Sequence, residues 1–170
     1  GQIILKGEKE VVLCRTDELK LLGTHNFENV MAASAMAAAY GAPLDVIRKT
    51  ILEFQGVEHR IEFVAEKGGV AYYNDSKGTN PDAAIRGICA MNRPTLLIGG
   101  GYDKDIPFDD WCKLFKGRVK YLVLIGQTRN IIAECAKKYG FTNVMFAEDM
   151  DEAVKDCAAY ADEGDYVLLS

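Results

Sequence analysis

From residue 59 onward, the sequence alternates short apolar runs with stretches of helical spacing, and this alternation restricts the fold more than any other feature. The runs at residues 95–98, 119–125 and 166–169 are apolar at nearly every position. Strands of a parallel sheet have this composition, because helices cover both of its faces. We therefore predict the α/β class, with a doubly wound, mostly parallel, Rossmann-like sheet over residues 59–170.

The elements of this region follow from apolar periodicity and from the turn residues between the runs. Asn80 is a plausible N-cap, and Pro81 suits the first turn of the helix after it. We predict strands at residues 61–65, 70–73, 95–98, 119–125, 144–146 and 166–169, and helices at residues 81–91, 108–115, 129–139 and 150–161.

Residues 1–58 have a different pattern and are predicted to be the tail of another domain. Two β-rich runs flank Gly7-Glu8-Lys9 and indicate a hairpin, and two helices with a Gly-Ala-Pro junction follow it. A linker is expected just before the second domain. The predicted elements are strands at residues 3–6 and 11–14, helices at residues 26–40 and 44–54, and the linker at residues 55–57.

Composition excludes several classes of function. The net charge of −5 argues against general binding to nucleic acid. The five cysteines are odd in number and widely spaced, so neither a disulfide framework nor a zinc site is expected, and isolated thiols suit a reducing cytoplasm. We expect no metal site in this chain. No run is long enough to span a membrane, and the first residues do not resemble a signal peptide.

Three polar or glycine-rich loops follow predicted strands, at residues 74–80, 99–105 and 126–128, and Ser170 stands at the end of another. In open α/β sheets, ligands bind outside the carboxyl ends of the strands. The sequence therefore predicts a ligand site at this edge.

The loop at residues 74–80 joins a β-rich run to the start of a helix, where free backbone N–H groups attract anions. Lys77 adds a positive charge, Thr79 adds a hydroxyl donor, and Asp75 suits a ribose hydroxyl or a metal-bound water. A polar turn with an N-cap explains the same residues equally well.

The loop at residues 99–105 begins with three glycines, which allow the backbone to approach a ligand, and Lys104 projects a cation close by. A flexible connection is the alternative. The string lacks the spacing of a dinucleotide-binding loop, so a nicotinamide cofactor is not expected.

Asn26 and Asn29 lie three residues apart at a predicted helix start, so their amides share a face that suits the edge of a base. N-capping by Asn26, with Asn29 exposed, is the alternative. Arg60 suits a phosphate or ribose contact, or an ion pair with Glu62.

Taken in order, these strings resemble the Mur ligase family, in its D-glutamate-adding branch. The resemblance covers essentially the whole chain, and the loop at residues 74–80 discriminates best. The strings are Gly23-Thr24-His25-Asn26 with Asn29, then His59-Arg60-Ile61-Glu62, then Asn74-Asp75-Ser76-Lys77-Gly78-Thr79-Asn80, then Gly99-Gly100 with Asp103-Lys104.

The resemblance implies a part of a cytoplasmic, monomeric, three-domain ligase of peptidoglycan synthesis. Residues 1–58 would be the carboxy-terminal end of its central ATPase domain, and residues 59–170 its amino-acid-binding domain, truncated at the end. Because the chain contains no ATP phosphate-loop string, the isolated chain is expected to be inactive. The cofactors implied are ATP and Mg²⁺, with the metal ligands outside this chain.

The implied reaction joins D-glutamate to UDP-N-acetylmuramoyl-L-alanine through an acyl phosphate. By resemblance, Asn26 and Asn29 would contact adenine, and Arg60 and Asp75 the ribose and phosphate region. The catalytic Lys77 would lie near the reacting phosphate, because phosphoryl transfer depends on positioning and charge stabilisation.

Thr79, Lys104 and Ser170 would bind the carboxylates of D-glutamate by the same resemblance. Two alternatives stay open: another amino-acid ligase of the superfamily, such as a folate-glutamate ligase, or a non-catalytic Rossmann-like module that binds a small anion.

Overall fold

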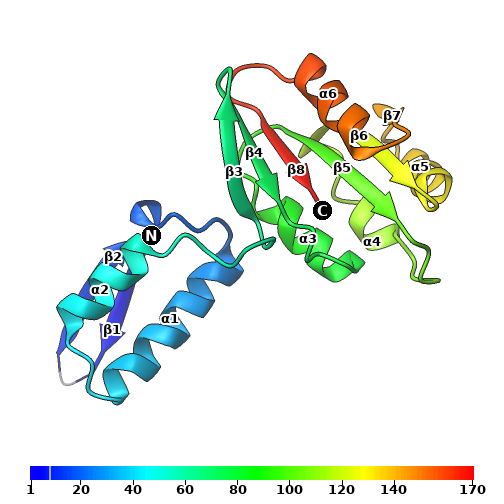
Figure 1. Ribbon diagram of the computed structural model, residues 1–170. Helices are drawn as coiled ribbons and strands as arrows, with labels where there is room; N and C mark the ends of the chain where they lie inside the picture. Colours follow the sequence, from blue (N-terminus) through cyan, green and yellow to red (C-terminus); the bar gives the residue numbers. More distant parts are fainter. Residues whose placement is uncertain (8) are drawn as a thin grey trace. The chain divides into compact units, whose positions relative to one another are not determined.

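The computed structural model describes residues 1–7 and 9–170, which form two compact units, Gly1–Gly56 and Val57–Ser170 (Figure 1). The division falls within the linker predicted at residues 55–57. Each unit has its own apolar core. No helix in the described part of the chain is both long and apolar enough to cross a membrane.

The first unit is a two-stranded antiparallel hairpin with two helices. Its elements are β1 (Gln2–Lys6), β2 (Glu10–Arg15), the short 3₁₀ helix η1 (Thr16–Glu18), α1 (Thr24–Ala39) and α2 (Leu44–Glu53). Glu8, in the predicted hairpin turn, lies outside the described residues. The core is built by apolar residues of the strands and of both helices: Ile3, Leu13, Cys14, Leu19, Val30, Ile47 and Ile51.

Helix α1 begins two residues earlier than predicted, and its N-cap is Gly23, with φ 91°. The N-capping alternative for Asn26 is therefore wrong. Its side chain is 8% exposed, and Nδ2 donates to the carbonyl of Leu22 at 2.7 Å. Asn29 is exposed, so one asparagine is enclosed and the other faces outward.

The second unit contains the predicted α/β sheet, with strand order β3-β4-β8-β5-β6-β7. Strands β4, β8, β5, β6 and β7 run parallel to one another. Strand β3, at one edge, pairs antiparallel with β4. The elements are β3 (Glu62–Lys67), β4 (Val70–Asn74), α3 (Pro81–Ala90), β5 (Thr95–Gly101), α4 (Asp109–Cys112), β6 (Val119–Gly126), α5 (Arg129–Lys138), β7 (Val144–Phe146), α6 (Met150–Tyr160) and β8 (Tyr166–Leu169).

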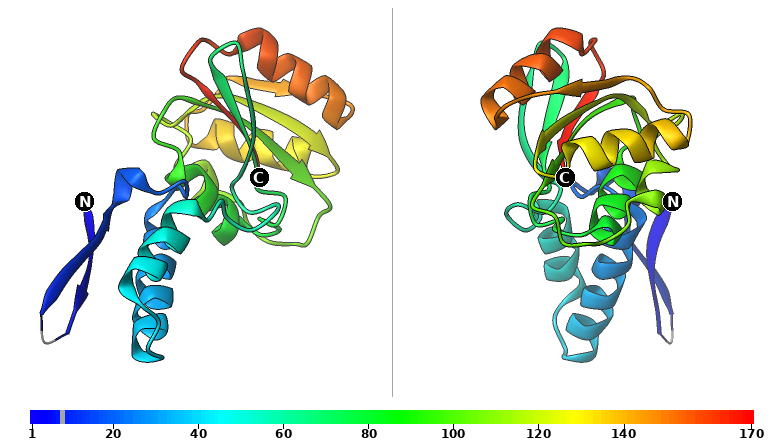
Figure 2. Two further views of the ribbon diagram at one scale, coloured as in Figure 1. Left: turned by 60° about the vertical axis from the view of Figure 1, so that its left-hand side comes forward. Right: turned by 90° about the vertical axis from the view of Figure 1, so that its right-hand side faces the viewer.

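Helices cover both faces of this sheet, with α6 on one face and α3, α4 and α5 on the other (Figure 2). Side chains of β5 alternate between the two layers, as the period of a strand requires. Leu96 and Ile98 pack in the cluster that includes Ala153 and Cys157 of α6, and Leu97 between them is also fully buried. The predicted fold class is confirmed.

Strand β5 is longer than predicted, because the three glycines at its end are part of the sheet. Gly100 pairs with Ile125 and Gly101 with Gly126 of β6. A Cβ on Gly100 would lie 2.1 Å from the carbonyl oxygen of Ile125. The glycines therefore allow one strand to approach another, and the expectation of a loop at residues 99–101 is wrong.

Helix α4 is shorter than the helix predicted at residues 108–115. After Cys112 the backbone turns more tightly, with Leu114 N–H donating to Trp111 and Phe115 N–H to Cys112, and Gly117 follows at φ 84°. The apolar spacing reflected the burial of Trp111 and Phe115, which are 3% and 0% exposed. Tight turns place both side chains in the core as effectively as a longer helix would.

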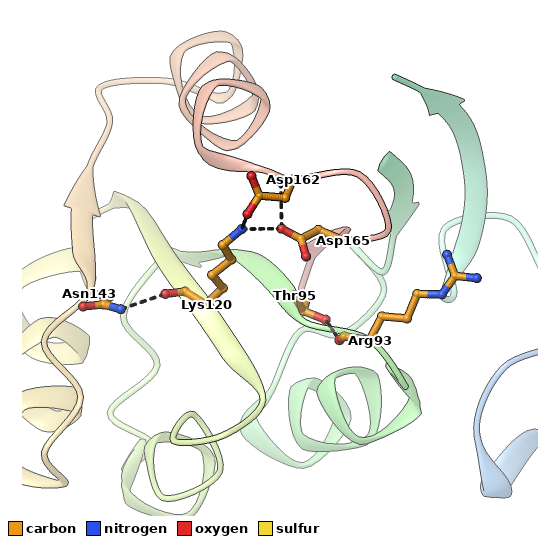
Figure 3. Close-up of polar contacts among 6 residues, drawn as sticks. All are labelled: Arg93, Thr95, Lys120, Asn143, Asp162 and Asp165. Carbon is orange, nitrogen blue, oxygen red and sulfur yellow. Dashed lines mark hydrogen bonds and ion pairs between the residues drawn. The ribbon is translucent and has the colours of Figure 1, made fainter. Parts of the chain in front are cut away.

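A buried carboxylate, Asp165, forms an ion pair with Lys120 at the amino ends of the sheet strands. Lys120 Nζ lies 2.6 Å from Asp165 Oδ2 and 2.7 Å from Asp162 Oδ2 (Figure 3). Asp165 is 5% exposed, and its Oδ2 also accepts from the backbone N–H of Asp162 at 2.9 Å. Because Lys120 belongs to β6 and Asp165 precedes β8, this contact joins two strands that are not neighbours in the sheet.

We expect Gly100→Ala to destabilise the second unit strongly. Its φ of 114° strains an alanine, and the new Cβ would displace the main chain of β6. Together these effects should lower the unfolding free energy by about 3 kcal/mol or more. The matched control is Gly101→Ala, which has φ 140° but open space at its Cβ. Equal losses in the two variants, measured by chemical unfolding, would show that the close strand approach contributes nothing.

Replacing Lys120 should leave the buried Asp165 carboxylate without its cation. We expect Lys120→Met to lower the unfolding free energy by about 1–3 kcal/mol. Lys155→Met is the control, because its pair with Asp151 is 73% and 76% exposed and should contribute about 0.5 kcal/mol or less. Urea unfolding measures the unfolding free energy of both variants. If Lys120→Met lost no more stability than Lys155→Met, the pair of Lys120 with Asp165 would not stabilise the fold.

Candidate functional site

A cavity of about 350 Å³ lies at the carboxyl ends of the sheet strands in the second unit. All three loops that the sequence placed at this edge contribute to it, as does Ser170. The polar lining comprises Ser76, Thr79, Asn80, Tyr102, Lys104, Thr128 and Ser170, and the rest includes Gly78, Pro81, Ala84, Gly100, Ile106, Phe108, Trp111, Ile125, Ile132, Met150 and Leu169.

The loop after β4 is fixed by its own backbone. Asp75 N–H continues the sheet by donating to Leu169 at 2.8 Å, and the carbonyl of Asp75 accepts from Gly78 N–H at 2.7 Å. Asn80 then caps α3, because its Oδ1 accepts from the backbone N–H of Ala83 at 2.9 Å. The predicted N-cap and the proline in the first turn are confirmed. The loop therefore presents its side chains from a defined backbone.

The three residues expected to bind D-glutamate all line the cavity. Lys104 Nζ donates to the carbonyl of Thr79 at 2.9 Å, which ties the loop after β5 to the loop after β4. Ser170 N–H donates to the carbonyl of Ile98 at 3.0 Å and so fixes the end of β8 against β5. The arrangement gathers one cation and several hydroxyl groups at one opening, which suits an anionic ligand.

Asp75 lies beneath this opening and is only 4% exposed. Its Oδ1 accepts from the backbone N–H of Ile61 at 3.1 Å, and its Oδ2 accepts from the Ser170 hydroxyl at 3.3 Å. Burial raises the pKa of the carboxyl above its ordinary value, while these two hydrogen bonds and the charge of Arg60 act in the opposite direction. The carboxylate is thus a partly compensated buried charge.

The segment around Arg60 has strained backbone that hydrogen bonds from neighbouring residues fix in place. His59 and Ile61 have φ of 65° and 46°, which non-glycine residues rarely adopt. The carbonyl of His59 accepts from Lys77 N–H at 3.0 Å, and Asn74 Nδ2 contacts His59 Nδ1 at 3.0 Å. Backbone strain of this kind persists only where the surroundings enforce it, and it is common at functional sites.

The other predicted site residues lie outside the cavity lining. Arg60 and Lys77 are exposed, and Asn26 and Asn29 belong to the first unit. The alternative pairing of Arg60 with Glu62 is not observed in the described chain. Glu62 Oε2 accepts from the backbone N–H of His59 at 2.8 Å.

Sequence analysis missed the apolar wall of the cavity. Ile106, Phe108, Trp111, Ile132 and Met150 line it. All but Ile106 fall in predicted helices, and Ile106 was not assigned to any element. A Cβ on Gly99 would lie 2.7 Å from Trp111 Cη2, so the indole packs directly against the strand. The available indication was the single tryptophan of the chain, in the first helix predicted after the glycine-rich strand end.

Over residues 1–7 and 9–170, no group of three or more His, Cys, Asp and Glu side chains is placed to hold a metal ion. A second cavity, of about 390 Å³, lies at the amino ends of the strands beside Arg93, Arg118 and Lys120. Two carboxylates already bind Lys120 there, so the first cavity is the stronger candidate site.

Comparison with known proteins gives a family for this arrangement. Residues 59–170 match the family described as Mur ligase, glutamate ligase domain. Curated proteins from Lachnoclostridium phytofermentans and Lachnospira eligens, both named UDP-N-acetylmuramoylalanine–D-glutamate ligase, are 56% identical over 163 residues and 54% identical over 164 residues. Each alignment covers 96% of this chain and 36% of the relative, so the chain spans about a third of the length of these relatives.

Solved structures show the same fold at lower identity. UDP-N-acetylmuramate-alanine ligase from Thermotoga maritima has a TM-score of 0.73 at 19% identity, covering 96% of this chain and 36% of its own. Folylpolyglutamate synthase from the same organism has a TM-score of 0.68 at 23% identity, covering 98% and 40%. These likenesses support the fold alone.

The raised pKa of Asp75 predicts how stability depends on pH. Because the folded state holds this proton more tightly than the unfolded chain, the unfolding free energy falls as pH rises from 3.8 through the folded pKa. Asp75→Asn lacks this dependence. The stability of the variant relative to the natural protein should therefore increase over that window and stay constant above it. Chemical unfolding at a series of pH values measures the difference, and a decrease would contradict the assignment.

Proposed function

The chain belongs to the Mur ligase family, and from this premise we propose that it is part of an ATP-dependent ligase that adds D-glutamate to UDP-N-acetylmuramoyl-L-alanine in peptidoglycan synthesis. The names of the relatives at 56% and 54% identity support this substrate pair. The observation that carries the proposal is the cavity where Thr79, Lys104 and Ser170 meet. A cation surrounded by hydroxyl groups suits a carboxylate ligand.

We propose that the second unit binds the amino acid and that Thr79, Lys104 and Ser170 hold its carboxylates. Lys77, exposed at the loop that precedes α3, would stabilise the reacting phosphate of an acyl phosphate. The amine of D-glutamate would then attack the acyl carbon, and phosphate would leave. The apolar wall around Trp111 would exclude water from this step.

We propose that the first unit is the carboxy-terminal end of a central ATPase domain. Helix α1 and the residue that caps its end, Tyr40, support this, because they expose large apolar side chains. Val30 is buried, whereas Met31, Met36 and Tyr40 are 45%, 67% and 98% exposed. Exposed apolar side chains that gather on one element are typical of an interaction surface, so further parts of the ligase would cover this surface.

Nucleotide contacts are proposed for Asn26 and Asn29 at adenine, and for Arg60 and Asp75 near the ribose and phosphates. The exposed guanidinium of Arg60 is available for such a contact. The described residues offer no ligand set for Mg²⁺, so its ligands are proposed to lie in the rest of the ligase. The free cysteines are consistent with a cytoplasmic location, and a monomer is proposed.

A folate-glutamate ligase is the second candidate within the family. The likeness to folylpolyglutamate synthase, at 23% identity, concerns the fold and does not favour that substrate. ADP release by the intact ligase, compared between D-glutamate with UDP-N-acetylmuramoyl-L-alanine and L-glutamate with folate, separates the two.

The chain of residues 1–170 alone is predicted to release no ADP with D-glutamate and UDP-N-acetylmuramoyl-L-alanine, because it contains no phosphate loop. The intact ligase, assayed in parallel, is the positive control. Turnover by the isolated chain would show that catalysis does not need the ATPase domain and would overturn the proposed division of roles.

In the intact ligase, Lys104→Ala should raise the KM for D-glutamate by about 10- to 150-fold, because a hydrogen bond to a charged group contributes about 1.5–3 kcal/mol. The KM for ATP should change little. Lys137→Ala, an exposed lysine on α5 outside the cavity lining, is the control. An unchanged KM for D-glutamate would exclude a contact between Lys104 and the substrate.

A further inference from the structure

The Asp75 carboxylate joins two parts of the site that are distant in sequence. Oδ2 accepts from the hydroxyl of Ser170, at the end of β8, and Oδ1 accepts from Ile61 N–H, beside Arg60. The backbone of Asp75 makes two more bonds, to Leu169 and Gly78. With 4% of its surface exposed, the residue lies beneath the cavity rather than in its lining.

Two glycines make room for this contact. A Cβ on Gly87, in α3, would lie 2.8 Å from Asp75 Oδ2 and 3.2 Å from Ser170 Oγ. A Cβ on Gly78 would lie 2.9 Å from Asp75 Oδ2 and 3.1 Å from Ser170 Oγ. Both oxygen atoms therefore pack against positions where any side chain would move them. Glycine is unfavourable inside a helix, so its presence in α3 is explained by this packing.

The other carboxylate oxygen of Asp75, Oδ1, accepts from the strained backbone at Ile61. Ile61 is β-branched and has φ 46°, a conformation that costs free energy and needs external support. Its N–H is bonded to Asp75, and the neighbouring carbonyl of His59 is bonded to Lys77 N–H. The position of Arg60, between these two residues, is thus set by the same loop that carries Thr79.

We propose that Asp75 is a positioning residue for the amino-acid side of the site, which orients the Ser170 hydroxyl and links it to the backbone that carries Arg60. This inference rests on the proposed function and goes beyond a nucleotide contact. The Ser170 hydroxyl has one hydrogen, so while it is donated to Asp75 its Oγ can only accept from a ligand in the cavity. To hold a carboxylate of D-glutamate, the hydroxyl turns this hydrogen from Asp75 toward the ligand, while Asp75, Gly78 and Gly87 keep Oγ in place. Displacing Asp75 changes the direction in which Ser170 can donate, so D-glutamate binding changes without loss of any direct contact.

Gly87→Ala tests the link from a position outside the cavity lining. In the intact ligase it should raise the KM for D-glutamate about 5-fold or more, the size expected for one displaced hydrogen bond. The KM for ATP should rise by less, because the new Cβ lies against Asp75 Oδ2 and Ser170 Oγ, whereas the Arg60 backbone is bonded to the other oxygen, Oδ1. Cys89→Ala, at an exposed position of the same helix, is the control and should leave both values unchanged. An unchanged KM for D-glutamate in Gly87→Ala would overturn the proposal.

A double-mutant cycle of Asp75→Asn and Ser170→Ala separates positioning from other roles. If Asp75 acts through Ser170, each single variant raises the KM for D-glutamate and the double variant is no worse than the poorer single one. A rise in the KM for ATP alone would mean a nucleotide contact only. Equal increases for both substrates, with a lower melting temperature, would mean a general structural role. Either result would overturn the proposal.

A measurement without substrate keeps the inference separate from the proposed function. Ser170→Ala removes a hydrogen bond that lowers the pKa of Asp75, so the titration midpoint of the ¹³C-labelled Asp75 carboxyl should rise. The amide shift of Ile61 should follow the same midpoint. If the intact ligase does not use D-glutamate, the proposed function fails, whereas an unmoved Asp75 midpoint would overturn the link to Ser170.

Discussion

The insertion of β8 between β4 and β5 is the constraint on which the rest of the second unit depends. Residues 166–169 pair with residues 71–74 on one side and with residues 95–98 on the other. The last strand in sequence therefore joins two halves of the sheet. Closing this long loop costs entropy, and the burial of Tyr166, Val167 and Leu168 helps to offset that cost. Leu168, at its centre, is fully buried.

This insertion also assembles the site. Because parallel strands end at one edge, β8 brings Ser170 next to the loop after β4 and the end of β5. The contacts that result are between residues far apart in sequence: Asp75 with Leu169 and with the Ser170 hydroxyl, and Ser170 with Ile98. A buried carboxylate is tolerated there because hydrogen bonds and the charge of Arg60 partly compensate for its lost hydration.

The misread parts of the sequence have a common physical cause. Gly99, Gly100 and Gly101 indicated a loop, but the absence of Cβ atoms lets β5 continue beside β6. The apolar spacing after Phe108 indicated a long helix, whereas tight turns bury Trp111 and Phe115 equally well. In both cases a local pattern reported what must be buried or brought close, without specifying the backbone that achieves it.

The sequence by itself determined the α/β class, nearly all elements, the edge of the sheet where the loops of the candidate site lie, and the family, through the motif at residues 74–80. Periodicity, caps and turn residues act over a few neighbours, so they can be read locally. Only the tertiary structure decided that Asp75 lies beneath the cavity, that Trp111 lines it, and that Gly87 is needed for packing against Ser170. Those outcomes depend on which distant segments the central strand brings together, and no local pattern encodes that pairing.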